Sequence, residues 1–435
     1  MNLLAVVFAL LVGVPVVVGE VAGVDVSPAD LACLTALPLA FVAPKGGPAA
    51  RLAIAMALSL AAILFVQIFV DGRGNIRPFF SLLFFFRPYL VFFAGYTLVR
   101  TAAEFRSLFR TLVLVYAAVT MIVAGGALAS GTAPFAWPHC ELKLLGLPLY
   151  GHFGINALSV QLVSMLALMY VLVFYREGST VAPGLLLATP AGLLGYCVLV
   201  SHSRQAILGL AAFVGMALAD AAGMSSARKL VLSAALLTAT LVVAANSEQL
   251  SADMEAAWAN KLERDARAVE TGDWVGYSAG RLAMYRDELE DLARNPLVGT
   301  GFRGFWLYHE HDYDDPVGLS PHQQYLGAAW KMGIPAALFY FAFLWHAFTP
   351  LYRLARARRS PNVFLGLWRL ALVYLAVFCN IQDALTFVGT GSMLMLLLGG
   401  AAAVERHQQL ALRRPVARPS LVPLAPVSKQ RTRAA

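Results

Sequence analysis

The sequence has 435 residues, of which 59% are hydrophobic and only 13% are charged, and its net charge is +8 at pH 7. Soluble domains carry roughly a quarter charged residues, so this composition excludes an ordinary soluble protein and predicts a polytopic membrane protein. The positive charge does not indicate a nucleic-acid partner. Lys and Arg lie mostly in short loops and the C-terminal tail, where they act as orientation signals.

Apolar runs of about 17–23 residues recur along the chain, and each is long enough to cross about 30 Å of hydrocarbon as a helix. We place about twelve of these spans. They lie near residues 2–19, 27–43, 51–70, 79–99, 108–129, 155–175, 183–200, 204–221, 228–245, 330–350, 363–380 and 386–403. Because no basic region or cleavage site opens the chain, residues 1–19 are predicted to be a retained span.

Basic residues follow the even-numbered spans, which predicts that those loops and both termini are cytoplasmic. The sequence therefore predicts an all-α membrane protein with one large helical loop on the outer side. Residues 1–245 hold spans one to nine, 246–329 the outer loop, 330–405 the last three spans, and 406–435 a disordered basic cytoplasmic tail.

The outer loop has two predicted helices. The stretch from Ser251 to Glu270 suits an exposed helix with i,i+4 ion pairs, Lys261–Asp265 and Glu263–Arg267. A second helix is predicted from the N-cap Ser278 to the Asn295-Pro296 break.

Two arginines at the outer surface are candidate phosphate ligands. Arg204 closes a short outer turn, and Arg281 lies in the first turn of the second loop helix. Guanidinium binds phosphate oxygens bidentately and stays charged, and free N–H groups at a helix start add positive potential. The alternatives are a membrane-surface anchor for Arg204 and an ion pair with Asp287 or Glu288 for Arg281.

Arg303 and Arg87 are further candidates. Arg303 lies in a Gly-rich turn, and Arg87 is surrounded by apolar residues, where a charge is costly and usually functional. The alternative for Arg87 is that residues 79–86 form a separate interfacial piece and Arg87 merely begins the span.

His322 is the candidate catalytic residue. With Ser320 as N-cap and Pro321 at N1, His322 is predicted near N2 of a helix that re-enters the membrane. A helix N-terminus disfavours the imidazolium form, so a neutral imidazole could accept a proton from an incoming hydroxyl. The alternative is a boundary His that helps to cap the helix. Gln323 and Gln324 could orient a sugar hydroxyl or the His.

Three other patterns are set aside. The GxGxxG pattern at Gly299–Gly304 follows a helix rather than a strand, so its glycines are predicted to form a tight turn against the membrane domain. The acidic and His-rich stretch 309–315 is consecutive and cannot converge on one ion, so no metal site is predicted. The spacing of the four cysteines predicts neither a disulfide framework nor a metal site.

The order of these motifs on a twelve-span scaffold resembles the bacterial O-antigen ligase and O-antigen polymerase superfamily. The motifs are Ser203-Arg204, Ser278-Ala-Gly-Arg281, Asn295-Pro-Leu-Val-Gly-Thr-Gly301, His322 to Leu326, and Met332-Gly-Ile-Pro335. One departure is Gln323, where Asn is expected after the His. The sequence Gly154-Ile-Asn156 stands where relatives often have Asn-rich sequence, so the resemblance makes Asn156 a candidate substrate contact together with Gln323.

The resemblance implies a metal-independent glycosyltransferase in the bacterial inner membrane, without a cofactor and with a periplasmic site. The donor would be polysaccharide linked to undecaprenyl diphosphate. Arg204 and Arg281 would bind the diphosphate and stabilise charge on the leaving group, while His322 would deprotonate or orient the acceptor hydroxyl.

The single long loop and the absence of a soluble C-terminal domain favour the ligase, whose acceptor is lipid A–core of lipopolysaccharide. The alternatives are a polymerase with a lipid-linked repeat unit as acceptor, a protein O-oligosaccharyltransferase, and a lipid-linked oligosaccharide flippase or other transporter. A transporter is expected to have repeated halves and charges near mid-membrane, whereas the informative charges here lie at the outer surface.

Overall fold

The computed structural model describes most of the predicted membrane domain and part of the outer loop. The described residues are 3–14, 18–21, 24–43, 47–66, 77–129, 143–144, 147–148, 154–175, 181–200, 204–221, 263, 266–273, 281–301, 323–357, 361–381, 384–386 and 388–413.

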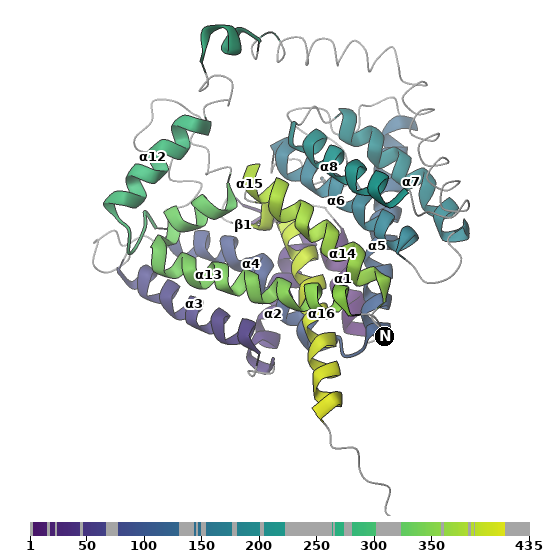
Figure 1. Ribbon diagram of the computed structural model, residues 1–435, viewed down its shortest axis with the longest axis horizontal. Helices are drawn as coiled ribbons and strands as arrows, with labels where there is room; N and C mark the ends of the chain where they lie inside the picture. The colour runs from purple at the N-terminus through teal and green to yellow at the C-terminus, as the bar shows by residue number, and fades with distance from the viewer. Residues whose placement is uncertain are drawn as a thin grey trace, which may run out of the picture.

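Helices make up nearly all of the described chain, which confirms the all-α class (Figure 1). The long helices are α1 (Leu3–Gly13), α2 (Pro28–Val42), α3 (Pro48–Phe65), α4 (Arg77–Leu98), α5 (Ala102–Ala129), α6 (Gly154–Phe174), α7 (Val181–Val200), α8 (Arg204–Ala221), α12 (Arg281–Arg294), α13 (Gln324–Arg356), α14 (Asn362–Val373) and α16 (Val388–Arg413). A π-helical turn η3 (Tyr374–Phe378), a short α15 (Cys379–Ile381) and a 3-10 turn η4 (Ala384–Thr386) join α14 to α16.

Two short antiparallel hairpins lie between helices. Strand β1 (Gly19–Val21) pairs with β2 (Val24–Val26), with Gly19 opposite Val26. Strand β3 (Lys143–Leu144) pairs with β4 (Leu147–Pro148). Both belong to connections rather than to a sheet that carries the core.

Every predicted span coincides with a helix except the one near 228–245, which lies outside the described residues. The expected boundaries are wrong in three places. The first helix ends at Gly13 and a strand begins at Gly19, α13 extends beyond the expected 330–350 at both ends, and α16 continues to Arg413, so 406–413 is helical rather than disordered tail.

Two helices in the described part of the chain are long and apolar enough to cross a membrane, Pro48–Phe65 and Gln324–Arg356, and shorter apolar helices accompany them. The expected number of about twelve spans stays a prediction.

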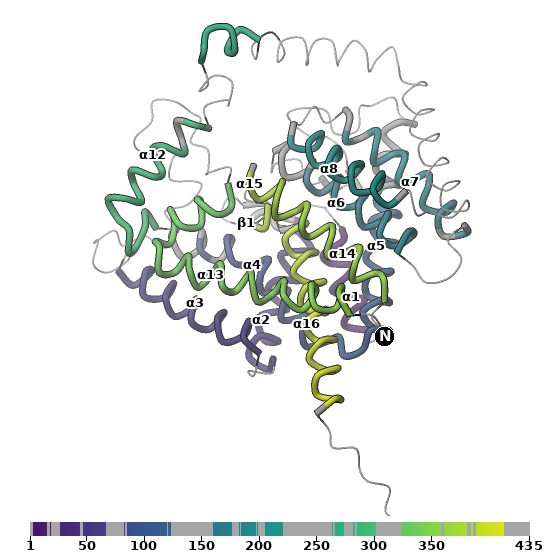
Figure 2. Tube along the Cα trace, viewed as in Figure 1, coloured from purple at the N-terminus to yellow at the C-terminus, as the bar shows by residue number. Residues whose placement is uncertain are grey.

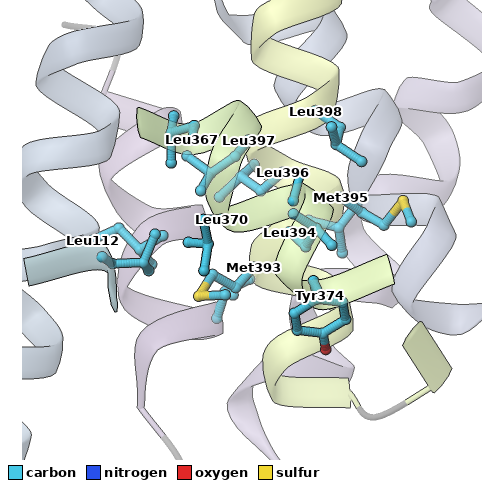
Figure 3. Close-up of a cluster of buried hydrophobic side chains, with 14 of the residues drawn as sticks. Leu112, Leu367, Leu370, Tyr374, Met393, Leu394, Met395, Leu396, Leu397 and Leu398 are labelled. Atoms are coloured by element: carbon cyan, nitrogen blue, oxygen red, sulfur yellow. The ribbon is translucent and has the colours of Figure 1, made fainter. Parts of the chain in front are cut away.

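The core centres on α4 and α16, whose backbones touch. A Cβ at Gly95 would collide with the carbonyl of Leu396, and one at Gly399 with the carbonyl of Phe92. Small residues permit this close approach of helices. Beside the crossing, Leu- and Met-rich turns of α16 pack with Leu112 of α5 and with α14 (Figure 3).

We expect Gly399→Ala to lower the Tm of the detergent-solubilised protein, because one methyl group must push two backbones apart. Overpacking costs about 1–3 kcal/mol where side chains can adjust, and backbone adjusts less readily. Gly215→Ala is the matched control, since a Cβ there meets nothing within 4 Å. An equal Tm for both variants would contradict the backbone contact.

Candidate functional site

Three of the predicted site residues lie at the beginnings of helices. Arg204 is the first residue of α8, Arg281 is the first residue of α12, and His322 directly precedes the N-cap of α13. The first N–H groups of a helix have no partner within it and carry partial positive charge. The side chains of Arg204 and Arg281, and all of His322 and Arg303, lie outside the described residues, so their meeting around one anion stays a prediction.

The N-cap of α13 is Gln323 and not Ser320. Gln323 has extended backbone angles, and its side-chain oxygen accepts a hydrogen bond from the N–H of Leu326. The prediction that His322 lies at N2 is therefore wrong, because the helix starts after this residue. The long Gln side chain reaches the N3 amide and performs the capping that was assigned to Ser320. Its amide oxygen is engaged in the cap, which leaves the amide nitrogen for the predicted sugar contact.

The first turn of α13 is anchored to the chain between α14 and α16. The buried Gln324 donates to the hydroxyl of Tyr340 (2.8 Å) and accepts from the N–H of Leu385 (3.0 Å). The next residue, Tyr325, donates to the carbonyl of Leu375 in the π-helical turn (3.0 Å). A π turn disturbs the regular helical hydrogen bonds, and here the carbonyl of Leu375 accepts a hydrogen bond from the side chain of another helix.

A break in α13 at Gly333 receives the turn that follows α12. Gly333 has φ 73° and ψ 165°, which interrupts the helix. In a regular helix the Ile334 N–H would donate to the carbonyl of Trp330. The carbonyl of Lys331 would have no helical donor, because Pro335 has no N–H. Here Ile334 donates instead to the carbonyl of Pro296 (2.8 Å).

Thr300 and Gly301 supply the donors that the break leaves missing. The Thr300 N–H donates to the Trp330 carbonyl (2.8 Å), and its hydroxyl donates to the same oxygen (3.1 Å). The Gly301 N–H donates to Lys331 (2.9 Å). We call residues 295–301 the inserted turn. The indole of Trp330 also donates to Asp291 of α12 (3.3 Å), so α12 and α13 are held together.

The glycines of the inserted turn confirm the predicted tight turn against the membrane domain. Gly299 has φ 69° and Gly301 has φ 84°, a region that residues with a Cβ rarely adopt. A Cβ at Gly299 would lie 2.5 Å from the Gly333 nitrogen. Figure 2 shows α12 at the edge of the molecule, next to α13.

Arg87 has a carboxylate partner inside the membrane domain. Its guanidinium pairs with Asp30 of α2, and the two side chains are only 10% and 9% exposed. Asp30 also accepts from the backbone and hydroxyl of Ser27 (2.8 and 2.7 Å), which completes a capping box. Helix α4 is continuous from Arg77 to Leu98, so the alternative of a separate piece at 79–86 is wrong. The contact of Arg87 with a diphosphate stays a prediction.

Comparison with known proteins finds a similarity in the segment that holds most of these features. Residues 189–341 match the family model described as O-antigen ligase. This segment is therefore similar to the O-antigen ligase family. The matched segment runs from within α7, through α8, α12 and the inserted turn, to the first half of α13. It therefore contains Arg204, Arg281, Arg303, His322 and Gln323.

A second similarity is to a curated protein. The chain is 26% identical over 235 residues to the exopolysaccharide production protein ExoQ of Rhizobium meliloti (strain 1021), covering 51% of each protein. The chain thus spans about half the length of the relative that it matches. The description of the family and the name of the relative both refer to bacterial polysaccharides.

The other predictions from the sequence concern Asn156, a metal site and the ion pairs of the outer loop. Asn156 is in the first turn of α6, with its side chain outside the described residues, as is the stretch 309–315. No group of three His, Cys, Asp or Glu that could hold a metal ion occurs within the described ranges. The Glu263–Arg267 ion pair is confirmed at 3.0 Å, while Lys261–Asp265 falls on undescribed residues.

Sequence reasoning missed one charged cluster in the membrane domain. Asp220 of α8 pairs with Arg369 of α14 and accepts hydrogen bonds from Tyr170 (3.1 Å) and Tyr175 of the α6 end. The signal was an Asp and an Arg within apolar runs, which usually pair with one another. This cluster joins the ends of α6 and α8 to α14.

We expect Gly299→Ala and Gly333→Ala to lower the Tm of the purified protein more than Gly272→Ala does. All three glycines have positive φ, but a Cβ at Gly272 meets nothing within 4 Å. The Gly272 variant thus reports backbone strain alone, about 1–2 kcal/mol. The other two add a collision between the inserted turn and α13, so equal losses would contradict that packing.

The Arg87–Asp30 pair predicts coupled substitutions. Arg87→Met should destabilise the protein by about 3–5 kcal/mol, since it leaves Asp30 buried and uncompensated. Adding Asp30→Asn should recover most of that loss and keep the acceptors of the capping box. The measurement is thermal unfolding of single and double variants. A double variant no more stable than Arg87→Met would contradict the pairing.

Donor binding by the double variant then tests the predicted diphosphate contact of Arg87. We expect weaker binding of a lipid-linked diphosphate by this folded variant. Unchanged binding would remove Arg87 from the set of diphosphate ligands.

Proposed function

We propose that the protein is an O-antigen ligase. It transfers polysaccharide from undecaprenyl diphosphate to a sugar hydroxyl of lipid A–core at the periplasmic face of the bacterial inner membrane. The observation that carries this proposal is that one superfamily match contains Arg204, Arg281 and His322, each at or directly before the start of a helix.

The donor is an anion, and the proposed site offers positive charge of two kinds. Arg204 and Arg281 hold the diphosphate bidentately, and the first amides of α8 and α12 add their partial charges. As the bond between the anomeric carbon and the diphosphate oxygen breaks, negative charge grows on the leaving group, where fixed positive groups lower the barrier most. The guanidinium groups supply this charge without a metal ion. Arg303 is a further diphosphate contact in the proposal.

His322 is the proposed base of the reaction. It takes the proton of the acceptor hydroxyl while that oxygen bonds to the anomeric carbon. Gln323, through its amide nitrogen, and Asn156 are proposed to contact the sugar. In this proposal the undecaprenyl tail of the donor lies in the lipid. Both termini of the protein lie in the cytoplasm, and the outer loop 246–329 lies in the periplasm.

A second candidate function is polymerisation, with a lipid-linked repeat unit as acceptor. The name of the relative from Rhizobium meliloti, an exopolysaccharide production protein, favours it. The donor, the diphosphate ligands and the base are the same in both reactions, and only the acceptor differs.

We expect His322→Ala and Arg204→Ala each to lower glycan transfer by at least about 100-fold, the usual range for loss of a general base or a charge-stabilising group. The assay is consumption of lipid-linked donor by purified protein. The control is Arg286→Ala. Arg286 is on the same helix as Arg281, but its side chain is 72% exposed and pairs with Asp287. Undiminished transfer in either variant rejects that residue's role.

The products identify the acceptor. A single polysaccharide added to lipid A–core supports the ligase, and a growing ladder of repeat units supports the polymerase. Transfer in detergent by either route excludes a flippase, because a flippase needs two compartments to act.

A further inference from the structure

Gln324 is a buried polar side chain at the first position of α13, two residues after His322. The residue is 1% exposed, and both ends of its side-chain amide are bonded inside the protein, to Tyr340 and to Leu385. Burying an amide costs free energy unless its hydrogen bonds are made, so this geometry is strongly preferred over any shifted one.

The partners of Gln324 are themselves fixed. The carbonyl of Leu385 lies against Gly391 of α16, where a Cβ would collide with it, and Tyr374 donates to the neighbouring carbonyl of Ala384 (2.9 Å). The amide of Gln324 therefore meets a rigid backbone donor.

The hydroxyl of Tyr340 is held from the other side. It bonds to the hydroxyl of Tyr89 on α4 (2.6 Å), and the two rings pack edge to face at 5.6 Å. Gln324 thus joins three elements, α13, η4 and α4, at one buried point.

We propose that Gln324 is a positioning residue for the transfer reaction. Its two hydrogen bonds fix the first turn of α13, and this turn sets where the preceding His322 meets the acceptor hydroxyl. The inference rests on the proposed role of His322. Tyr325 adds a second anchor at the next residue, through Leu375.

The physical reason is geometric. A general base must lie within hydrogen-bond reach of the proton that it accepts, and a displacement of about 1 Å costs about 100-fold in rate. Gln324 touches neither donor nor acceptor in this scheme, so its loss should change the rate of the chemical step and leave donor affinity unchanged.

The test is Gln324→Met, which keeps the volume and removes both hydrogen bonds. We expect kcat to fall about 10- to 100-fold with KM for the lipid-linked donor unchanged. Tyr340→Phe removes the Tyr340 bonds to Gln324 and to Tyr89 but keeps the bond from Leu385 to Gln324, so it should give a smaller fall. Gln161→Met is the matched control, because Gln161 is also a buried helical Gln, 7% exposed, and lies outside the network.

A double-mutant cycle separates positioning from general stability. In a His322→Ala background, measured on the residual rate in single-turnover experiments, Gln324→Met should have no further effect. An equal loss in both backgrounds, a raised KM with unchanged kcat, or a wild-type rate for Gln324→Met would overturn the inference. Wild-type activity of His322→Ala would instead refute the assignment of the base and the inference with it.

A spectroscopic measurement tests the inference if the residual rate of His322→Ala is too low to measure. In protein labelled with ¹⁵N-histidine, the His322 resonance, assigned by its absence in His322→Ala, should shift in Gln324→Met and stay in place in Gln161→Met. An unshifted resonance in Gln324→Met overturns the inference.

Discussion

The inserted turn and the break in α13 depend on one another. Gly333 and Pro335 interrupt the hydrogen-bond ladder of a long apolar helix, and backbone groups without partners are costly in such surroundings. Thr300 and Gly301 provide the missing donors, and Pro296 accepts from Ile334. The loop helix α12 is thereby fixed to the helix that His322 precedes. A segment predicted to lie in the outer loop thus becomes part of the membrane domain's own backbone network.

A second set of buried polar contacts joins the start of α13 to neighbouring helices. Gln324, Tyr340 and Tyr89 join α13 to α4, and two residues before Tyr89 the guanidinium of Arg87 joins α4 to α2. Because apolar side chains gain little from associating in lipid, hydrogen bonds and close backbone packing fix the arrangement of such helices. The Gly95 and Gly399 crossing of α4 and α16 completes this rigid region.

This close packing suits the proposed transfer reaction, in which catalysis depends mostly on positioning and electrostatics. The segment that matches the family model, residues 189–341, contains the starts of α8, α12 and α13. In the proposed mechanism the first two hold an anionic leaving group and the third presents a base. Fixed charges avoid reorganisation when the leaving group departs, which is the physical advantage of mounting them on anchored helices.

The sequence by itself determined whatever depends on local patterns. Hydropathy predicted the positions of helices and the all-α class, and Asn295-Pro296 marked the end of α12. The i,i+4 spacing predicted the Glu263–Arg267 pair, and the glycines of 299–301 predicted a tight turn. The predicted start of α13 is wrong because a second residue nearby can cap the helix. The side chain of Gln323 is the N-cap, in place of Ser320.

Only the tertiary structure decided which distant groups meet. Arg87 finds Asp30 on another helix, Gln324 and Leu385 are 61 positions apart, and Tyr89 and Tyr340 are 251 apart. Hydropathy shows that a polar residue in an apolar run needs a partner, but the partner's identity follows from how the helices pack. That packing is set by contacts such as Gly399 against Phe92 and Gly299 against Gly333, which no periodicity along the chain encodes.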